Sequence, residues 1–364
     1  MASKARGLAD LGNAFNDGAL SNRNLIINGA MQVAQRGTSA TAAVNSSYST
    51  VDRFEFYLSG GGAYTTERST GHLADTGHDT ALKIAVTTAD TSIAAGDYYS
   101  FLQKIEAQNL QRLQYGTSSA KEMTLSFWVR ATKTGTQTMF VTKNDSTQYN
   151  FVQEYTINQS DTWEYKTIKI PALTASGITN DNGLGIQVGW ILKYGSTYEG
   201  AAGSWVSSTT LFTTSNAVNN MDSTSNTFYL TGVQLEVGDT ATPFEHRSFG
   251  QELALCQRYY QQVIYPASQY IAVGFAYQAH NGRFRLGYTE KRATPSVSFN
   301  LGTSAVKVYY NGVSNDDVTL QADAIGLTQS RVNYTLVNVT TQPIANAVGI
   351  LATGQVKLIV DAEL

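Results

Sequence analysis

The sequence predicts an all-β protein with an antiparallel jelly-roll sandwich, a short linking helix, a second small β-sandwich and a short N-terminal arm. Short segments in which apolar and polar residues alternate recur along the chain, and no long helical period separates them. Charged residues make up only 15% of the 364 residues, against roughly 25% in ordinary soluble domains. With 31 Gly and 21 Tyr, this composition favours β-structure with polar, uncharged outer faces.

Residues 1–23 form a segment of their own. Leu8, Leu11 and Phe15 have helical spacing, interrupted by Gly12 and Gly18, and this is too little apolar surface to fold alone. We therefore predict an arm that becomes ordered against another subunit or another protein. A frayed terminus is the alternative.

The first sandwich is predicted over residues 24–247. Phe54, Phe56 and Leu58 alternate with polar neighbours, as in a strand with one buried face. Strands are expected at residues 24–33, 52–58, 81–86, 98–105, 123–130, 137–142, 163–170, 184–192 and 227–237. Residues 108–114 fit either a short helical turn or a polar loop. Short strands with no long helix between them are typical of a jelly roll.

A short linking helix is predicted over residues 248–265. The apolar residues change there to intervals of four, three, four and three, which is a stripe on one helix face. The stripe consists of Phe249, Leu253, Cys256, Tyr260 and Val263. Ser248 and Gln251 fit a capping box, and Pro266 fits a stop. Because so short a helix is marginal alone, the stripe must pack either on a sheet of its own chain or on copies of itself around a symmetry axis.

The second β domain is predicted over residues 266–364. Its strands are expected at residues 270–277, 282–288, 296–300, 306–310, 317–324, 331–339 and 355–362. Asn311 and Gly312 predict a two-residue hairpin turn. This number of short strands is typical of a small β-sandwich.

Charge and cysteine content exclude several classes of function. The net charge of −3, without clustered Lys and Arg, argues against binding of nucleic acid. The single cysteine, Cys256, excludes an intrachain disulfide and a Cys-x-x-Cys metal site. No apolar stretch reaches the length of a membrane span, and residues 7–20 lack the apolar run of a secretory signal. We expect no membrane insertion, and a protein that is made and stays in a cytoplasm until something releases it.

Three sets of residues resemble a known family. NLIINGAMQVAQRG at residues 24–37, STVDRF at 49–54 and the junction at 234–260 are similar to tail-fibre proteins of tailed bacteriophages, particularly marine ones. Residues 124–136 and 162–171 resemble strands of the carbohydrate-binding-module-like jelly roll in such fibres. RATPSV at 292–297 and the final DAEL resemble their C-terminal domain. The resemblance covers most of residues 24–364, and the junction is its most specific part.

The resemblance implies a structural protein of the virion, a homotrimeric tail-fibre subunit assembled in the host cytoplasm. Its N-terminal end would attach to the tail, so Leu8, Leu11 and Phe15 are candidates for contacting a tail nozzle or adaptor protein. Its distal domain would recognise a glycan or protein of the host surface. The helix stripe is the candidate trimer interface.

Two sets of residues are candidates for glycan binding, because loops on rigid β scaffolds often carry binding residues. The first set is Tyr194, Tyr198 and Trp205, in a Gly-rich segment after a predicted strand. Core or subunit-interface packing is the alternative role for such aromatic residues. The second set, favoured if the C-terminal domain is the distal tip, is Tyr277, His280, Arg283, Arg285 and Tyr309.

Catalytic and cofactor motifs are absent from the sequence, so we expect binding without catalysis and no cofactor. His72 and His78 are six residues apart, which is unlike the spacing of a zinc site, and no metal site is predicted. Glu154, Asp161 and Glu164 cannot be paired by sequence as hydrolytic carboxylates. A surface-polysaccharide depolymerase and a purely structural tail connector remain the alternative functions.

Overall fold

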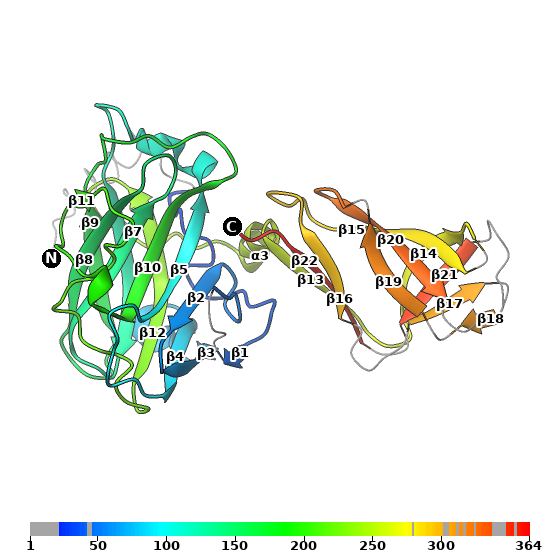
Figure 1. Cartoon of the computed structure of the whole chain (residues 1–364), viewed down its shortest axis with the longest axis horizontal. Coiled ribbons are helices and arrows are strands. Elements are labelled where there is room, and N and C mark those ends of the chain that lie inside the picture. The colour runs from blue at the N-terminus through cyan, green and yellow to red at the C-terminus, as the bar shows by residue number, and fades with distance from the viewer. Residues whose placement is uncertain are drawn as a thin grey trace. The chain divides into compact units, whose positions relative to one another are not determined.

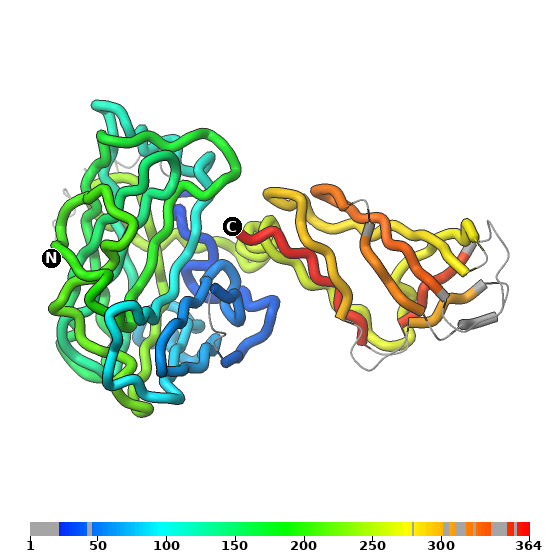
Figure 2. The backbone as a smooth tube through the Cα atoms, viewed as in Figure 1, coloured from blue at the N-terminus to red at the C-terminus, as the bar shows by residue number. Residues whose placement is uncertain are grey.

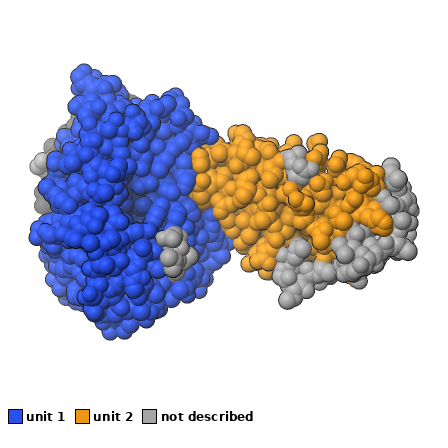
Figure 3. Space-filling model, in the orientation of Figure 1, with its two compact units in different colours: residues 1–252, 364 blue, residues 253–363 orange. Residues whose placement is uncertain are grey.

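The computed structural model describes residues 22–41, 46–278, 280–300, 306–310, 313–315, 318–323, 325–336, 347–352 and 355–364. The described chain is nearly all β, with antiparallel sheets, and this confirms the predicted fold class. It divides into two compact units (Figure 3): unit 1 comprises Met1–Glu252 with Leu364, and unit 2 comprises Leu253–Glu363. The arm residues Leu8, Leu11 and Phe15 lie outside the described residues.

Within its described residues, unit 1 is a jelly-roll sandwich of two six-stranded antiparallel sheets (Figure 1). The first sheet has the order β1 (Ser39–Thr41), β3 (Ala63–Thr70), β4 (Thr80–Thr88), β12 (Thr227–Val237), β6 (Met123–Ala131) and β9 (Glu164–Ile170). The second sheet has the order β11 (Trp205–Val206), β8 (Tyr149–Ile157), β7 (Gly135–Lys143), β10 (Leu184–Tyr194), β5 (Tyr98–Glu106) and β2 (Phe54–Ser59). Four of these strands, β1, β3, β8 and β11, were not predicted.

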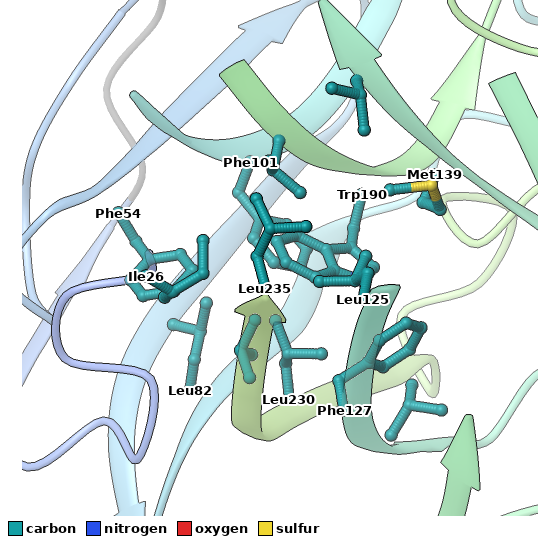
Figure 4. Packing of buried hydrophobic residues seen from close by; sticks show 14 of the residues in the cluster. Ile26, Phe54, Leu82, Phe101, Leu125, Phe127, Met139, Trp190, Leu230 and Leu235 are labelled. Carbon is teal, nitrogen blue, oxygen red and sulfur yellow. The ribbon is translucent and has the colours of Figure 1, made fainter. Parts of the chain in front are cut away.

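The main core of unit 1 lies between its two sheets and is centred on Trp190. Alternation along the strands turns one side of each strand inward, and the inward residues are almost all large and apolar. The Trp190 ring stacks on Phe101, with centroids 5.7 Å apart and planes 11° apart, and meets Phe127 edge-on at 5.6 Å. Figure 4 shows Leu125 and Leu235 beside it. The Trp190 ring therefore contacts rings from both sheets.

Residues 24–33 form no strand, so that prediction was wrong. The segment is irregular (Figure 2), and backbone hydrogen bonds fix it to the second half of β12. The Leu25 N–H donates to the Leu235 carbonyl at 2.8 Å, and the Val233 N–H donates to the Gly29 carbonyl at 2.9 Å. A Cβ at Gly29 would lie 2.1 Å from the Val233 carbonyl oxygen, so only glycine allows this approach. β4 pairs only with residues 227–230 of β12, and this segment follows it along the same edge.

The linking helix is shorter than predicted. α3 spans Phe249–Gln257 and begins with the expected capping box, since the Gln251 N–H donates to Ser248 Oγ at 3.3 Å. Tyr260 and Val263 instead lie in a strand, β13 (Tyr260–Tyr265). Over these residues a period of two fits as well as a helical period, and pairing with another strand decides between them.

The predicted stripe is therefore not one helix face. Cys256 and Tyr260 are buried within their own chain, and Val263 packs against the core of unit 2. Phe249, by contrast, is 57% exposed. Packing within the chain, the first of the two alternatives, accounts for the second half of the stripe.

The described part of unit 2 contains a three-stranded and a seven-stranded antiparallel sheet that share one core. The smaller sheet has the order β13, β22 (Val356–Asp361) and β16 (Ser296–Asn300), with β22 in the middle (Figure 1). The larger sheet has the order β18 (Val313–Asn315), β17 (Val306–Tyr310), β21 (Ala347–Ala352), β14 (Tyr270–Ala276), β15 (Asn281–Gly287), β20 (Gln329–Leu336) and β19 (Val318–Asp323). Tyr310 pairs with Val313, which confirms the predicted hairpin.

The remaining helices are short. α2 spans Leu73–Thr76, and two 3₁₀ helices, η1 and η2, span Ala107–Leu113 and Ser196–Tyr198. η1 confirms the helical alternative for residues 108–114. In the part of the chain that the structure describes, no helix is long and apolar enough to cross a membrane.

Candidate functional site

A cavity of about 230 Å³ opens on the outer face of the second sheet of unit 1. One outward-facing tyrosine from each of three strands lines it, together with a fourth tyrosine from the segment after β10. Two phenylalanines, a leucine and a glutamine complete the lining. These residues are Tyr57, Tyr98, Leu102, Phe140, Gln187, Tyr194, Tyr198 and Phe212, and we name the site the aromatic cavity. Its rings are in mutual contact, with centroids 5.1 Å apart for Tyr194 and Tyr198 and 6.1 Å apart for Tyr98 and Tyr198.

Strand alternation explains why these side chains face outward. On β5, Tyr99 and Phe101 enter the main core, so Tyr98 and Leu102 lie on the opposite face. They join a small second cluster that is separate from the main core. The same sheet therefore has an apolar inner face and an aromatic outer face.

A glycine makes room for the cavity floor. Gly189 on β10 lies between Phe140 of β7 and Leu102 of β5 in the cross-strand register. A Cβ at Gly189 would be 2.4 Å from the Phe140 ring. Because no side chain stands there, the Phe140 ring lies over the backbone of β10, and the sheet surface is hollowed at this point.

The polar groups of the aromatic cavity are uncharged. Tyr194 Oη and Ser100 Oγ are hydrogen-bonded at 2.7 Å, and the Tyr198 hydroxyl donates to the Gly96 carbonyl at 3.4 Å. Burial, and next the nearby Glu55 carboxylate, raises the pKa of Tyr57, so its hydroxyl remains protonated. Gln187 adds a half-buried carboxamide. The site offers hydroxyl and amide hydrogen bonds together with ring faces.

Of the three residues predicted in this segment, the structure brings Tyr194 and Tyr198 together and separates Trp205 from them. Trp205 lies on the edge strand β11 and packs against the main core. Its ring contacts Tyr115 and Phe151, and its Nε1–H donates to the Pro171 carbonyl at 2.7 Å. This placement favours the alternative role of Trp205, in core packing.

Sequence reasoning missed Tyr57, Tyr98, Phe140 and Phe212. They come from β2, β5, β7 and a loop, so only strand pairing brings them together. One signal was available: Tyr57 and Tyr98 stand at positions that alternation assigns to the outer face, where polar side chains are more usual.

The second predicted set lies in unit 2 and is only partly assembled. The Arg283 guanidinium lies 4.2 Å from the centroid of the Tyr277 ring, and Arg285 is two residues further along β15, on the same face. Tyr309 instead contacts Tyr270, with centroids 6.3 Å apart. His280 is exposed in the bend between β14 and β15.

The histidines of unit 1 pack against aromatic rings. His72 contacts Trp163 edge-on at 5.4 Å, and its Nε2 is 2.9 Å from Ser69 Oγ. His78 stacks on His246 at 5.5 Å, and burial lowers the pKa of His78 to about 4. Among the described residues, no three His, Cys, Asp or Glu side chains gather as metal ligands.

The carboxylates considered for hydrolysis have structural partners. Glu154 accepts hydrogen bonds from Thr214 Oγ1 at 2.5 Å and from Asn216 Nδ2 at 3.0 Å. Partial burial would raise the pKa of Glu164, but hydrogen bonds, chiefly from Lys166, outweigh it and lower that pKa to about 2. The Asp161 side chain is 63% exposed, beside Arg130. A general acid in glycan hydrolysis needs a raised pKa, so Glu164 is unsuited to that role.

Comparison with known proteins finds similar structures only. No family model matches the chain, and no curated protein does. A putative sugar binding protein from Bacteroides thetaiotaomicron is 12% identical, with a TM-score of 0.34, over 59% of this chain and 100% of that one. The family 11 carbohydrate-binding module of a cellulosomal cellulase from Clostridium thermocellum is 14% identical, with a TM-score of 0.28, over 56% of this chain and 100% of that one.

A phage protein is among the similar structures as well. The enzymatically active domain of tailspike protein 4 from bacteriophage CBA120 is 10% identical, with a TM-score of 0.30, over 59% of this chain. The match covers 21% of the chain of that domain. At these identities and TM-scores, no function or ligand is transferred to this chain.

Proposed function

We propose that this protein binds carbohydrate without catalysis and that the aromatic cavity is its binding site. The observation that supports this is the cavity itself: half-exposed rings of Tyr98, Tyr198 and Phe212 border an open space, and Gln187 lies within it. Such rings offer flat apolar faces to a sugar, while hydroxyl and amide groups bind its hydroxyls. If these rings served only as a small second hydrophobic core, their clustering would be explained. The open space that they border would not be explained.

The cavity favours a short stretch of neutral sugar. Its volume of about 230 Å³ is below the roughly 300–1,000 Å³ of drug-sized sites, which suits one or two sugar units better than a long chain. None of the described lining residues is charged. A carboxylate or phosphate would lose its hydration there without gaining a charged partner.

Substitution of the cavity rings tests this proposal. Binding of Tyr98→Ala and Phe212→Ala to a panel of neutral oligosaccharides, measured by calorimetry, should be about five- to tenfold weaker than that of the native protein, equivalent to about 1 kcal/mol or more. Tyr165→Ala is the matched control, since Tyr165 is 46% exposed and lies on β9 of the first sheet. Equal affinity of all three variants would contradict the assignment. Steady release of reducing ends from a bound polysaccharide would contradict the non-catalytic part.

We further propose, on the sequence resemblance, that the chain is a tail-fibre subunit that presents this binding site on a virion. A homotrimer would present three sites, and multivalent binding raises avidity by roughly 10²–10⁴ without any new contact. The support lies in NLIINGAMQVAQRG at residues 24–37 and in the junction at 234–260. Phe249 and Leu255, exposed on α3, are available for contact between copies, and the arm would bind the tail nozzle or adaptor.

The mass in solution tests the trimer. Light scattering should give three times the chain mass of 39.4 kDa. Phe249→Asp should lower that mass, because it places a carboxylate in each proposed contact. A native mass of one chain would count against the trimer, while leaving the carbohydrate proposal to the binding test.

A further inference from the structure

A second hollow lies on the seven-stranded sheet of unit 2 and has a different chemistry. Its volume is about 420 Å³. Three arginines and two apolar side chains dominate its lining: Val273, Phe275, Arg283, Arg285 and Arg331. We name it the arginine groove.

Strand register brings the guanidinium groups together. Arg285 of β15 lies directly opposite Arg331 of β20, and Arg283 lies opposite Asn333. Like charges directly opposite each other destabilise a sheet. In the strand register, Arg331 also lies opposite Asp323 of β19. The three guanidinium groups on this face would attract an anionic ligand.

The orientation of Arg283 is already set. Its Nε–H donates to Asn333 Oδ1 at 3.2 Å, and its guanidinium lies over the Tyr277 ring. Arg285 is exposed two residues along the same strand. A ligand therefore meets one oriented and one adaptable guanidinium on the same face.

Apolar surface lies beside these cations. Val273 is 72% exposed and Phe275 is 50% exposed, although both are large and hydrophobic. Phe275 is the cross-strand neighbour of Arg283. The Cβ atoms of directly opposite residues are about 5 Å apart. One sugar unit can therefore contact the Phe275 ring and the Arg283 side chain together. Contact with the same face of a second copy would instead bring arginines against arginines.

The net charge of unit 2 is opposite in sign to that of the rest of the chain. Residues 253–363 contain eight Lys and Arg and six Asp and Glu, a net charge of +2, whereas the whole chain carries −3. The long-range field of unit 2 therefore attracts anions, unlike that of unit 1.

We propose that the arginine groove binds a polyuronate, a polysaccharide whose carboxylate is bonded directly to the sugar ring. Phe275 supports the face of one sugar ring, and its cross-strand neighbour Arg283 binds the carboxylate of that ring. Arg285 and Arg331, further along the same face, bind the carboxylate of the next sugar through charge-assisted hydrogen bonds. The close spacing of ring and guanidinium favours a carboxylate on the sugar itself over a phosphate held further from it. This site is separate from the aromatic cavity and does not depend on it.

Binding of the full chain to polygalacturonate, alginate and hyaluronan tests the proposal. At least one should bind, and its affinity should fall as salt rises from about 0.05 to 0.5 M. Arg285→Gln and Arg331→Gln should each weaken binding about tenfold or more. Lys357→Gln is the control, since it removes the same charge from β22, outside the groove. Methyl esterification of the polygalacturonate should weaken binding to the same degree.

Four outcomes would overturn the proposal. The first is failure of all three polysaccharides to bind at low salt, and the second is an equal loss of polyuronate affinity in Lys357→Gln. The third is tighter binding of inorganic polyphosphate or single-stranded DNA than of any polyuronate. The fourth is loss of polyuronate binding in Phe212→Ala. The last outcome would assign the acidic sugar to the aromatic cavity. Phe212→Ala that keeps polyuronate binding but loses neutral sugar supports two separate sites.

Discussion

The aromatic cavity of unit 1 and the arginine groove of unit 2 are built in the same way and differ in chemistry. Each lies on the outer face of an antiparallel sheet, and each contains a strand glycine where a Cβ would collide. At Gly189 the collision is with the Phe140 ring at 2.4 Å, and at Gly274 it is with the Arg283 carbonyl oxygen at 2.2 Å. The surrounding residues are neutral and aromatic in one case and basic in the other.

In both units, outward strand positions are available to specify a ligand. Inward positions must fill a close-packed core, so their residue types are restricted. Outward positions are less restricted, although some of them fill the smaller second cluster of unit 1. Two sheets of one chain can therefore present different ligand chemistry on the same kind of scaffold.

The largest expected effect is a loss of stability in unit 1 that leaves unit 2 unchanged. Trp190→Ala removes a fully buried ring from the core of unit 1 and should destabilise that unit by about 3–5 kcal/mol. Unit 2 has its own core, so its hydrogen exchange should be unchanged. Mass-resolved hydrogen exchange of each unit measures this, with Tyr334→Ala as the reciprocal variant in unit 2. Equal acceleration in both units would show that they unfold together.

An effect of intermediate size is expected in the pH dependence of the stability of unit 1. Burial, and next the nearby His246, holds the pKa of His78 at about 4, against 6.5 for a free histidine. Protonation therefore favours the unfolded chain, so the contribution of His78 is complete above pH 6.5 and is lost as the pH falls toward 4. The loss should be roughly 2–3 kcal/mol for unit 1.

Urea unfolding between pH 7 and pH 4 measures this contribution. His78→Phe should flatten the pH dependence of unit 1, because its ring can pack on Phe244 without titrating. Unit 2 contains one histidine, His280, which is exposed, so no matching loss is expected there. An unchanged slope in His78→Phe would assign the pH dependence to other groups.

The smallest expected effect sharpens the contrast between the two sites. Arg285→Gln removes a like-charge pair and should stabilise unit 2 by about 0.2–1 kcal/mol at low salt, while it weakens polyuronate binding. In the aromatic cavity, Phe212→Ala should instead destabilise, because it removes contacts with Phe140 and Tyr194. Chemical denaturation of the two variants measures whether each is more or less stable than the native protein. A loss of stability in Arg285→Gln would mean that its guanidinium is a structural contact.

Local patterns were sufficient for most of the strands. The alternation in residues 52–58, 123–130 and 227–237 predicted β2, β6 and β12 within a few residues, because alternation of apolar and polar side chains is a local signal of a strand. Most of the polar positions are buried as well, which the alternation did not predict. Residues 24–33 and 260–265 were predicted wrongly. Pairing with β12 and with β22 decided their conformation, and neither partner is near in sequence.

The sequence by itself determined the all-β class and the capping of α3. It also named Tyr194, Tyr198, Arg283 and Arg285, which line the two proposed sites. Only the tertiary structure decided which side chains meet. Strand register placed Phe140 over Gly189 and Arg285 opposite Arg331, and it placed Trp205 against the main core. The physical reason is that a one-residue change of register would send each of these side chains to the opposite face, and register depends on strands far apart in the chain.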